Sequence, residues 1–305
     1  MNTTTSPSSS PRTRAQRALV LGGGGSAGNA WLIGVVAGLA DAGLDVTTAD
    51  VIVGTSAGAT AAAQITGAPP ARLHDDIVAS DATLPASAAH RSGRGTTRSM
   101  AAHMDRTQRI IDSSSDPADM RRRMGAAAIE LAASAEDAGP RWRTTVAARL
   151  PRPEWPVQRI LLTAVDAATG EPRVFDRLSG VELVDAVAAS CASGFAYRIG
   201  DRQYIDGGYR TNAENADLAA GFSKVLVLSP FSGASRTPAS WGTHLSAQVH
   251  DLRSRGSAVE TVFPDDESRA AFGDDVMDPA RRRPAALAGF AQGRKAAEPL
   301  APLWG

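Results

Sequence analysis

The alternation of apolar runs with glycine-rich turns predicts two strand-loop-helix units near the start of the chain. The apolar run Ala18–Leu21 leads into consecutive glycines and then into an apolar stretch over 29–42 that ends at Gly43. A second run, Asp50–Val53, leads through a Gly-Thr-Ser-Ala-Gly turn into an Ala-rich stretch that ends before Gly67. Units of this kind are typical of a parallel sheet with helices packed on its faces. The expected fold class is therefore α/β.

The middle of the chain loses this regularity. Residues 80–115 are rich in Ser, Arg, Gly and Thr, which indicates a mobile loop or cap with a short helix at 100–111. The pair Asp116–Pro117 then supplies a helix cap and a proline at the first helical position, and Gly139–Pro140 is expected to stop that helix. We therefore expect 80–150 to form a variable cap or helical insertion.

The remainder of the chain adds elements of the same kind. Strands are expected at 159–165, 173–175, 203–205, 225–228 and 258–263, and helices at 181–190, after Thr237 and at 279–297. With 305 residues and 43% apolar composition, the chain is long enough for one large core. We expect one domain over 17–300, preceded by a disordered tail at 1–16 that is polar and rich in Ser, Thr and Pro.

Composition narrows the functional classes. Lys plus Arg and Asp plus Glu both number 32, so no net field favours a polyanion, and nucleic acid is not an expected partner. Cys191 is the single cysteine, which excludes an intrachain disulfide. The N-terminal residues lack an apolar leader core, and the most apolar window, 30–40, is too short to span a bilayer. We therefore expect a cytoplasmic protein, with transient contact to a membrane surface left open and the oligomeric state not indicated.

The first motif with chemical meaning is Gly54-Thr55-Ser56-Ala57-Gly58, placed where an apolar strand meets a helix. A nucleophile elbow forces its central residue into a strained conformation, so the flanking positions must be nearly free of side chain. The small residues Gly54, Ala57 and Gly58 meet that demand. The helix that starts at Ala57 also points its positive end toward Ser56. The pentapeptide alone is weak evidence, because turns of small residues are common in Ala- and Gly-rich chains.

The second motif is the glycine-rich run Gly22–Gly28, directly after a predicted strand. Gly23, Gly25 and Gly28 also fit the spacing of a dinucleotide-binding loop. Both interpretations use unhindered backbone N–H groups at a helix N-terminus, which hold a phosphate in one case and an oxyanion in the other. The serine turn on the next strand favours the oxyanion hole, because a dinucleotide fold has no use for it.

The third motif is Asp206-Gly207-Gly208, some 150 residues after Ser56. An isolated Asp-Gly-Gly is a turn in most proteins. Its weight comes from following the other two motifs in order.

Together, the three motifs and their surroundings resemble the patatin-like phospholipases, especially bacterial members of the actinobacterial type. The likeness is carried by ALVLGGGGSAGNAW, VIVGTSAGATAAAQ, LVDAVAASCAS and YIDGGYRTNAENADLAAG, and it runs from about residue 17 to near the C-terminus. The resemblance implies a three-layer α/β/α sandwich with a mostly parallel central sheet.

The resemblance also implies a mechanism. Ser56 is the implied nucleophile, Asp206 the implied proton acceptor, and the amides of Gly23, Gly24 and Gly25 the implied oxyanion hole. The implied activity is hydrolysis of carboxylic ester bonds in lipids such as phospholipids, lysophospholipids or acylglycerols, with no metal and no cofactor. The residues expected to support the motifs are Gly28, Gly54, Ala57, Gly58, Gly207 and Gly208. No histidine takes part, and surface or loop positions are expected for His74, His90, His103, His244 and His250.

Two positions depart from the usual pattern of that family. The family often has Arg or Lys just before the last glycine of the first motif, where this chain has Ala27. The family also often has proline after the small-residue run, where this chain has Ala192–Phe195. The first difference removes any contact that the cation makes. The second is expected to reshape the pocket, and so to affect substrate choice more than catalysis.

Several other features have a plain structural interpretation. Three consecutive arginines occur at 121–123 and again at 281–283, and such runs are more often solvated helix faces than contacts to lipid headgroups. Cys191 is interpreted as a small buried residue, and Asp265–Asp266 as a solvated loop.

Three other functions stay open at this point. An α/β-hydrolase with a Ser-His-Asp triad needs a histidine downstream of Asp206, which only His244 or His250 supplies. A nucleotide-binding oxidoreductase would bind NAD or NADP at the glycine loop. A catalytically silent lipid-binding or regulatory protein would carry the same three motifs, so only activity separates it from an enzyme.

Overall fold

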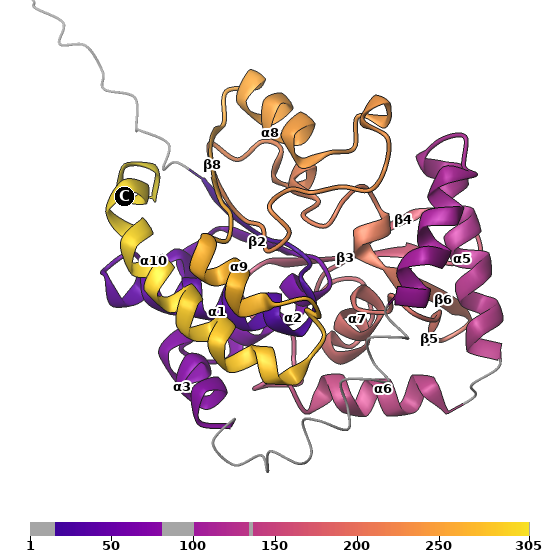
Figure 1. Ribbon diagram of the computed structural model, residues 1–305, viewed down its shortest axis with the longest axis horizontal. Helices are drawn as coiled ribbons and strands as arrows, with labels where there is room; N and C mark the ends of the chain where they lie inside the picture. Colours follow the sequence, from indigo (N-terminus) through magenta and orange to yellow (C-terminus); the bar gives the residue numbers. More distant parts are fainter. Residues whose placement is uncertain (1–15, 81–100, 134–136, 305) are drawn as a thin grey trace, which may run out of the picture.

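The computed structural model describes residues 16–80, 101–133 and 137–304, and Figure 1 shows a central sheet with helices around it. Its strands are β1 (Arg17–Leu21), β2 (Val51–Gly54), β3 (Ile160–Asp166), β4 (Pro172–Phe175), β5 (Tyr197–Ile199), β6 (Arg202–Asp206), β7 (Lys224–Leu228) and β8 (Ala258–Val262). Its helices are α1 (Gly25–Asp41), α2 (Ala57–Gly67), α3 (Pro70–Ser80), α5 (Pro117–Ala133), α6 (Ala138–Ala147), α7 (Leu183–Ser190), α8 (Leu245–Ser254), α9 (Asp266–Phe272) and α10 (Arg282–Trp304). Residues 101–112 are also helical.

The sheet is mixed but mostly parallel. Its strands follow the order β5-β6-β3-β2-β1-β7-β8, and β4 pairs with β3 outside this path. The run from β3 to β8 is parallel, whereas β4 and β6 pair with β3 in the antiparallel direction. The prediction of an α/β sandwich with a mostly parallel sheet is confirmed. Because β1 and β2 are parallel neighbours, the glycine loop after β1 and the serine turn after β2 leave the same edge of the sheet.

Successive residues of the central strands face two separate cores. In β1, Leu19 and Leu21 belong to the larger core, which α1, α2, α7 and α10 cover. Ala18 and Val20 belong to a second core on the opposite face, which α8 covers. Side chains of neighbouring strand residues point to opposite faces. Since both faces are covered, the strand is apolar throughout rather than alternating with polar residues.

Helix α10 lies against α1 over most of its length (Figure 1). Glycines make this close approach possible: a Cβ on Gly34 would lie 2.2 Å from the carbonyl oxygen of Ala286. A Cβ on Gly293 would lie 2.3 Å from the carbonyl oxygen of Val35. Backbones packed this closely leave no freedom for one helix to slide along the other. The two helices run in the same direction, so the start of α10 is held beside the start of α1.

Most of the predicted elements are found, and two predictions were wrong for local reasons. Gly139–Pro140 does not stop a helix but lies in the first turn of α6. Proline is tolerated there because the N–H groups of the first turn have no hydrogen-bond partner within the helix. Asp265 and Asp266 do not form a solvated loop. Asp265 caps α9 by accepting a hydrogen bond from the Ser268 N–H at 2.9 Å. Helices α3, α6 and α9 and strand β5 were not predicted.

Two predictions fall partly outside the described residues, namely the disordered tail at 1–16 and the segment 81–100 of the expected cap. Within the described part, the helix expected at 100–111 is found at 101–112. None of the described helices is long and apolar enough to cross a membrane.

Candidate active site

Ser56 lies between β2 and α2 in a conformation that few non-glycine residues adopt. Its φ of 54° and ψ of −115° are in a strained region of backbone space. A Cβ on Gly54 would lie 2.7 Å from the Cα of Ala59. A Cβ on Gly58 would lie 1.9 Å from the carbonyl oxygen of Leu21. The glycines on either side of Ser56 are therefore required by close contacts, and the turn is built as a nucleophile elbow.

The strained turn is held by the C-terminal end of α7. The Ser56 N–H donates a hydrogen bond to the hydroxyl oxygen of Ser190 at 3.0 Å. The thiol of Cys191 donates to the Ser56 carbonyl oxygen at 3.1 Å. Both backbone groups of Ser56 thus have side-chain partners, which offset part of the cost of the strain.

The register of the sheet brings Asp206 to the same point. Gly54 of β2 pairs with Leu162 of β3 in the parallel direction. Two residues further along both chains, Ser56 therefore reaches the level of Ala164. Asp206, the last residue of β6, pairs with Ala164. The Ser56 side chain accordingly lies close enough to the Asp206 carboxyl group to influence its pKa.

Asp206 is buried, unlike a typical surface carboxylate. It is only 6% exposed, and its Oδ1 accepts a hydrogen bond from the Gly208 N–H at 2.8 Å. Burial raises the pKa of Asp206 to about 6, and the hydrogen bond from Gly208 and the interaction with Ser56 oppose that rise. A carboxylate with a pKa near neutrality accepts a proton more readily than an ordinary aspartate does.

The glycine loop lies directly beside Ser56, since a Cβ on Gly23 would lie 3.6 Å from the Ser56 Cβ. The N–H of Gly23 donates to the carbonyl oxygen of Ala213 at 2.8 Å and is therefore already used. Among the described residues, no acceptor is found for the N–H groups of Gly24 and Gly25 at the N-terminus of α1. These two amides lie at the positive end of a helix and are free to bind an anion.

The remaining motif residues also pack around this point. A Cβ on Gly28 would lie 3.0 Å from the Cβ of Pro230, and a Cβ on Gly207 would lie 2.1 Å from the Oγ1 of Thr163. Ala57 is the first residue of α2. Three motifs that lie far apart in the sequence are thus neighbours in the fold.

Asn215 is a residue of this site that the sequence analysis did not identify. It is fully buried and has a left-handed backbone with a φ of 55°. Its Nδ2 donates to the Thr55 hydroxyl at 3.0 Å and to the Gly207 carbonyl oxygen at 2.9 Å. Thr55 precedes Ser56 and Gly207 follows Asp206, so one amide group connects the two turns. No local sequence pattern around Asn215 indicates these distant partners.

The histidines downstream of Asp206 do not approach it in the described structure. The Nε2 of His244 bonds to the carbonyl oxygen of Thr237 at 2.8 Å. His250 is exposed on α8. Neither residue has a hydrogen bond to Asp206 or Ser56. The described residues also contain no group of three or more His, Cys, Asp or Glu side chains that could hold a metal ion.

The upstream histidines differ in their surroundings. His74 was expected at the surface or in a loop, which was wrong: it is buried on α3. Its ring lies against that of Phe290, with centroids 4.7 Å apart. The reason is that α3 was not predicted, so its buried face was not foreseen. His103, on helix 101–112, reaches the Tyr209 hydroxyl at 3.4 Å, and His90 lies outside the described residues.

A strained serine beside a buried aspartate at the edge of an α/β sheet is an arrangement typical of serine hydrolases. The family model for patatin-like phospholipases matches residues 19–219. That span is more than half of the chain and contains all three motifs, so the chain belongs to the patatin-like phospholipase family. Membership supports a lipid hydrolase activity in general terms.

Two solved structures are similar to this chain over most of its length. VipD from Legionella pneumophila is 12% identical with a TM-score of 0.42, and the match covers 93% of this chain and 67% of VipD. The second match is to a chain in the structure of full-length SpcU in complex with full-length ExoU from the type III secretion system of Pseudomonas aeruginosa. Its sequence identity is 19% and its TM-score is 0.32. That match covers 92% of this chain and 53% of the matched chain. No curated protein sequence matches this chain.

Proposed function

We propose that the protein is a serine acyl hydrolase that cleaves carboxylic ester bonds of lipids, with Ser56 as the nucleophile and Asp206 as the general base. The observation that carries the proposal is that the strained Ser56 lies beside a buried Asp206 whose pKa is raised to about 6. Phospholipids, lysophospholipids and acylglycerols are the candidate substrates.

The dyad can carry both halves of the reaction. In the first half, Asp206 takes the hydroxyl proton while the Ser56 Oγ attacks the ester carbonyl carbon. The bond to the alcohol then breaks, and the alcohol leaves with the proton from Asp206. In the second half, Asp206 takes a proton from a water molecule that attacks the acyl-enzyme. The Ser56 oxygen recovers that proton as the fatty acid leaves, so Asp206 ends each half unprotonated.

The amides of Gly24 and Gly25 are the proposed oxyanion hole. Both lie at the N-terminus of α1, and neither N–H has an acceptor among the described residues. Donors that are already fixed in place stabilise the negative oxygen without reorganisation, and the loss of one such donor costs about 3 to 4 kcal/mol in other hydrolases. Gly23, whose N–H is bonded to Ala213, is proposed to position the loop next to Ser56.

The alternatives are less well supported. A Ser-His-Asp triad would need His244 or His250 to move to Asp206, whereas His244 is bonded to Thr237. A catalytically silent lipid-binding protein would have the same geometry, so only a measurement of ester turnover distinguishes it from an enzyme.

The test is labelling with a fluorophosphonate probe combined with turnover of p-nitrophenyl butyrate and of phospholipid micelles. We expect Ser56→Ala to abolish labelling and turnover, and Asp206→Asn to abolish turnover. Ser232→Ala is the matched control, because Ser232 is an exposed serine that also has a positive φ, 56°. Labelling that persists in Ser56→Ala would place the nucleophile elsewhere, and loss of turnover in His244→Ala or His250→Ala would favour the triad.

A further inference from the structure

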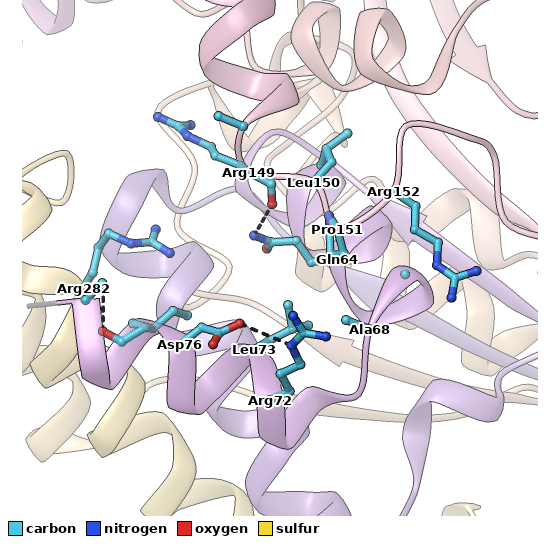
Figure 2. Close-up of a pocket in the computed structure, with 14 residues that line it drawn as sticks. Gln64, Ala68, Arg72, Leu73, Asp76, Arg149, Leu150, Pro151, Arg152 and Arg282 are labelled. Carbon is cyan, nitrogen blue, oxygen red and sulfur yellow. Dashed lines mark hydrogen bonds and ion pairs between the residues drawn. The ribbon is translucent and has the colours of Figure 1, made fainter.

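A pocket of about 420 Å³ lies at the C-terminal end of α2 (Figure 2). It is lined by the end of α2, by α3, by the segment 148–152 and by the first residue of α10. Ser56 and Asp206 do not line it. The polar and charged residues that matter here are Gln64, Arg72, Asp76, Arg149, Arg152 and Arg282.

The positive charge of this pocket is not balanced. Four arginines and one aspartate line it, which gives a local charge of plus three in a chain that is neutral overall. Asp76 pairs with Arg72 at 3.7 Å. Among the described residues, Arg149, Arg152 and Arg282 have no carboxylate within ion-pair distance.

Arg282 is the half-buried member of the group. Its Nη1 donates to the carbonyl oxygen of Ser26 and to the Oδ1 of Asn29, both at 3.2 Å, and both acceptors are neutral. Burial, together with the nearby charge of Arg149, lowers the pKa of Arg282 to about 10, so the group is still cationic at neutral pH. Two cations that repel each other, one of them partly desolvated, are stabilised by an anion that contacts both.

The fold holds Arg282 in this position. The glycine contacts between α1 and α10 fix where α10 begins, and Arg281 and Arg283 on either side of Arg282 are exposed. The three consecutive arginines are therefore not equivalent. The Arg282 guanidinium also reaches the backbone next to Ala27, the position where the family often has a basic residue.

The pocket is connected to the serine turn through Asn29. The Nδ2 of Asn29 donates to the carbonyl oxygen of Ala57 at 3.3 Å and to the Oε1 of Gln64 at 2.9 Å. Its Oδ1 accepts the hydrogen bond from Arg282. Ala57 follows Ser56, and Gln64 lies about 10 Å further along α2, at the rise of an α-helix. Arg282, Asn29 and Gln64 thus belong to one hydrogen-bonded group that reaches from the pocket to the first residue of α2.

We propose that this pocket binds a phosphate group through the guanidinium groups of Arg149 and Arg282. A phosphate matches the site because its oxygens accept hydrogen bonds from two guanidinium groups at once and its charge offsets the local excess. The same chemistry is found in the headgroup of a phospholipid substrate and in a small soluble phosphate ester. The headgroup case rests on the proposed hydrolase function, whereas binding of phosphate by the pocket does not.

The first experiment is calorimetric titration of the full chain with inorganic phosphate and with glycerol 3-phosphate. We expect Arg149→Gln and Arg282→Gln to weaken binding about tenfold or more, as the loss of a hydrogen bond to a charged group does. Arg283→Gln, an exposed neighbour on the same helix, is the matched control and should bind like the wild type. Thermal unfolding without phosphate shows whether each variant folds. Arg149→Gln is the safer variant, because Arg149 is exposed and its guanidinium stacks on Trp142 at 5.4 Å.

The second experiment identifies the source of the phosphate. It compares kcat and KM for phosphatidylglycerol and for diacylglycerol with the same acyl chains, both in neutral detergent micelles. If the ligand is the headgroup, Arg149→Gln raises KM for phosphatidylglycerol about tenfold and leaves KM for diacylglycerol unchanged. If the ligand is a soluble phosphate ester, neither KM changes while binding of glycerol 3-phosphate is lost. Either result supports a phosphate site.

The proposal is overturned if the wild type binds neither soluble phosphate and Arg149→Gln leaves both KM values unchanged. It is also overturned if Arg149→Gln and Arg282→Gln bind phosphate as tightly as Arg283→Gln. Hydrolysis of p-nitrophenyl butyrate, which has no headgroup, separates this failure from failure of the proposed function. Hydrolysis without phosphate binding rejects the pocket alone. Arginine-dependent phosphate binding without hydrolysis rejects the hydrolase alone.

Discussion

The thiol of Cys191 donates a hydrogen bond to the carbonyl oxygen of Ser56, with the two atoms 3.1 Å apart. Burial and the nearby negative charge of Asp206 raise the pKa of this thiol to about 12. The thiol is therefore protonated at neutral pH, which the donor role requires, and a protonated thiol is a poor nucleophile. Cys191 thus supports the serine turn and is not itself a candidate nucleophile.

We expect Cys191 to resist iodoacetamide in the folded protein and to react fully once the protein is unfolded in urea. The Cys191→Ala variant should be less stable by about 1 kcal/mol, the value of one hydrogen bond, and should retain turnover. Mass spectrometry of the alkylated protein and thermal unfolding measure these effects. Rapid alkylation of the native protein would contradict the raised pKa.

The acidic limb of the pH–rate profile should reflect the ionisation of Asp206. Only the ionised carboxylate can accept the Ser56 proton, so kcat/KM for p-nitrophenyl butyrate should fall about tenfold per pH unit well below the pKa. The midpoint of that limb is expected near pH 6, where burial places the pKa of Asp206. A limb centred near pH 4 would mean that the base is an ordinary exposed carboxylate.

The raised pKa of Asp206 should also cost stability in a predictable pH range. The folded state holds the Asp206 proton more tightly than the unfolded state does, because the pKa is raised from 3.8 to about 6. The stability contributed by the protonated group is therefore fully present below the pKa of Asp206 in the unfolded protein. It is lost as the pH rises through the pKa of Asp206 in the folded protein. Above that range the charged group destabilises the fold by about 1 to 3 kcal/mol.

Asp206→Asn should therefore be more stable than the wild type at pH 8 while being inactive, and the two should converge near pH 4. Urea unfolding at both pH values measures the difference. Ser56→Ala is the control for loss of activity, since it removes the nucleophile and leaves the carboxylate in place. An Asp206→Asn variant that is less stable than the wild type at pH 8 would contradict this reasoning.

The placement of Ser56 next to the glycine loop could be predicted from the sequence because the packing that dictates it is local. Small residues at 54 and 58 are dictated by contacts with Ala59 and Leu21 within the same two strand-loop-helix units. Their placement can be inferred from adjacent strands. Asp206 was implied only by the resemblance, since a single Asp-Gly-Gly turn does not indicate that it pairs beside β3.

Contacts between distant segments could not be predicted in this way. Arg282 lies among three arginines that a sequence pattern treats alike, and only the packing of α10 on α1 makes it half-buried. His74 is buried because α3 packs beside α1 and α10, and no local period shows that contact. Such residues acquire their role from the tertiary structure rather than from their neighbours in the chain.

The contact at Gly58 provides a sharp test of the serine turn. A Cβ at this position would lie 1.9 Å from a backbone oxygen of β1, so Gly58→Ala must shift either the strand or the turn. We expect a loss of about 2 kcal/mol or more in the free energy of unfolding, together with loss of fluorophosphonate labelling. Gly67→Ala on the same helix is the control. Its Cβ would meet only the Pro151 ring at 3.4 Å or more, so stability should be unchanged or rise by up to about 1 kcal/mol.

Asn215 allows the connection between the turns that carry Ser56 and Asp206 to be tested separately from backbone strain. Asn215→Gly keeps the left-handed conformation accessible and deletes the side-chain bonds to Thr55 and Gly207. Asn215→Ala deletes the same bonds and adds about 1 to 2 kcal/mol of strain. If the amide group holds Ser56 and Asp206 in register, kcat should fall about tenfold or more in both variants, whereas only the alanine variant should show the added loss of stability.

The measurements are kcat and KM for p-nitrophenyl butyrate and urea unfolding of both variants. A fall in kcat with little change in KM is expected, because the substrate-binding surface is left in place while the reacting groups lose their alignment. Asn212, whose Oδ1 accepts hydrogen bonds from the backbone N–H groups of Glu214 and Asn215, shapes the same loop without touching either turn. Asn212→Ala should therefore lower stability more than kcat. If Asn215→Gly retains full kcat, the serine and the aspartate are held in register by the sheet alone.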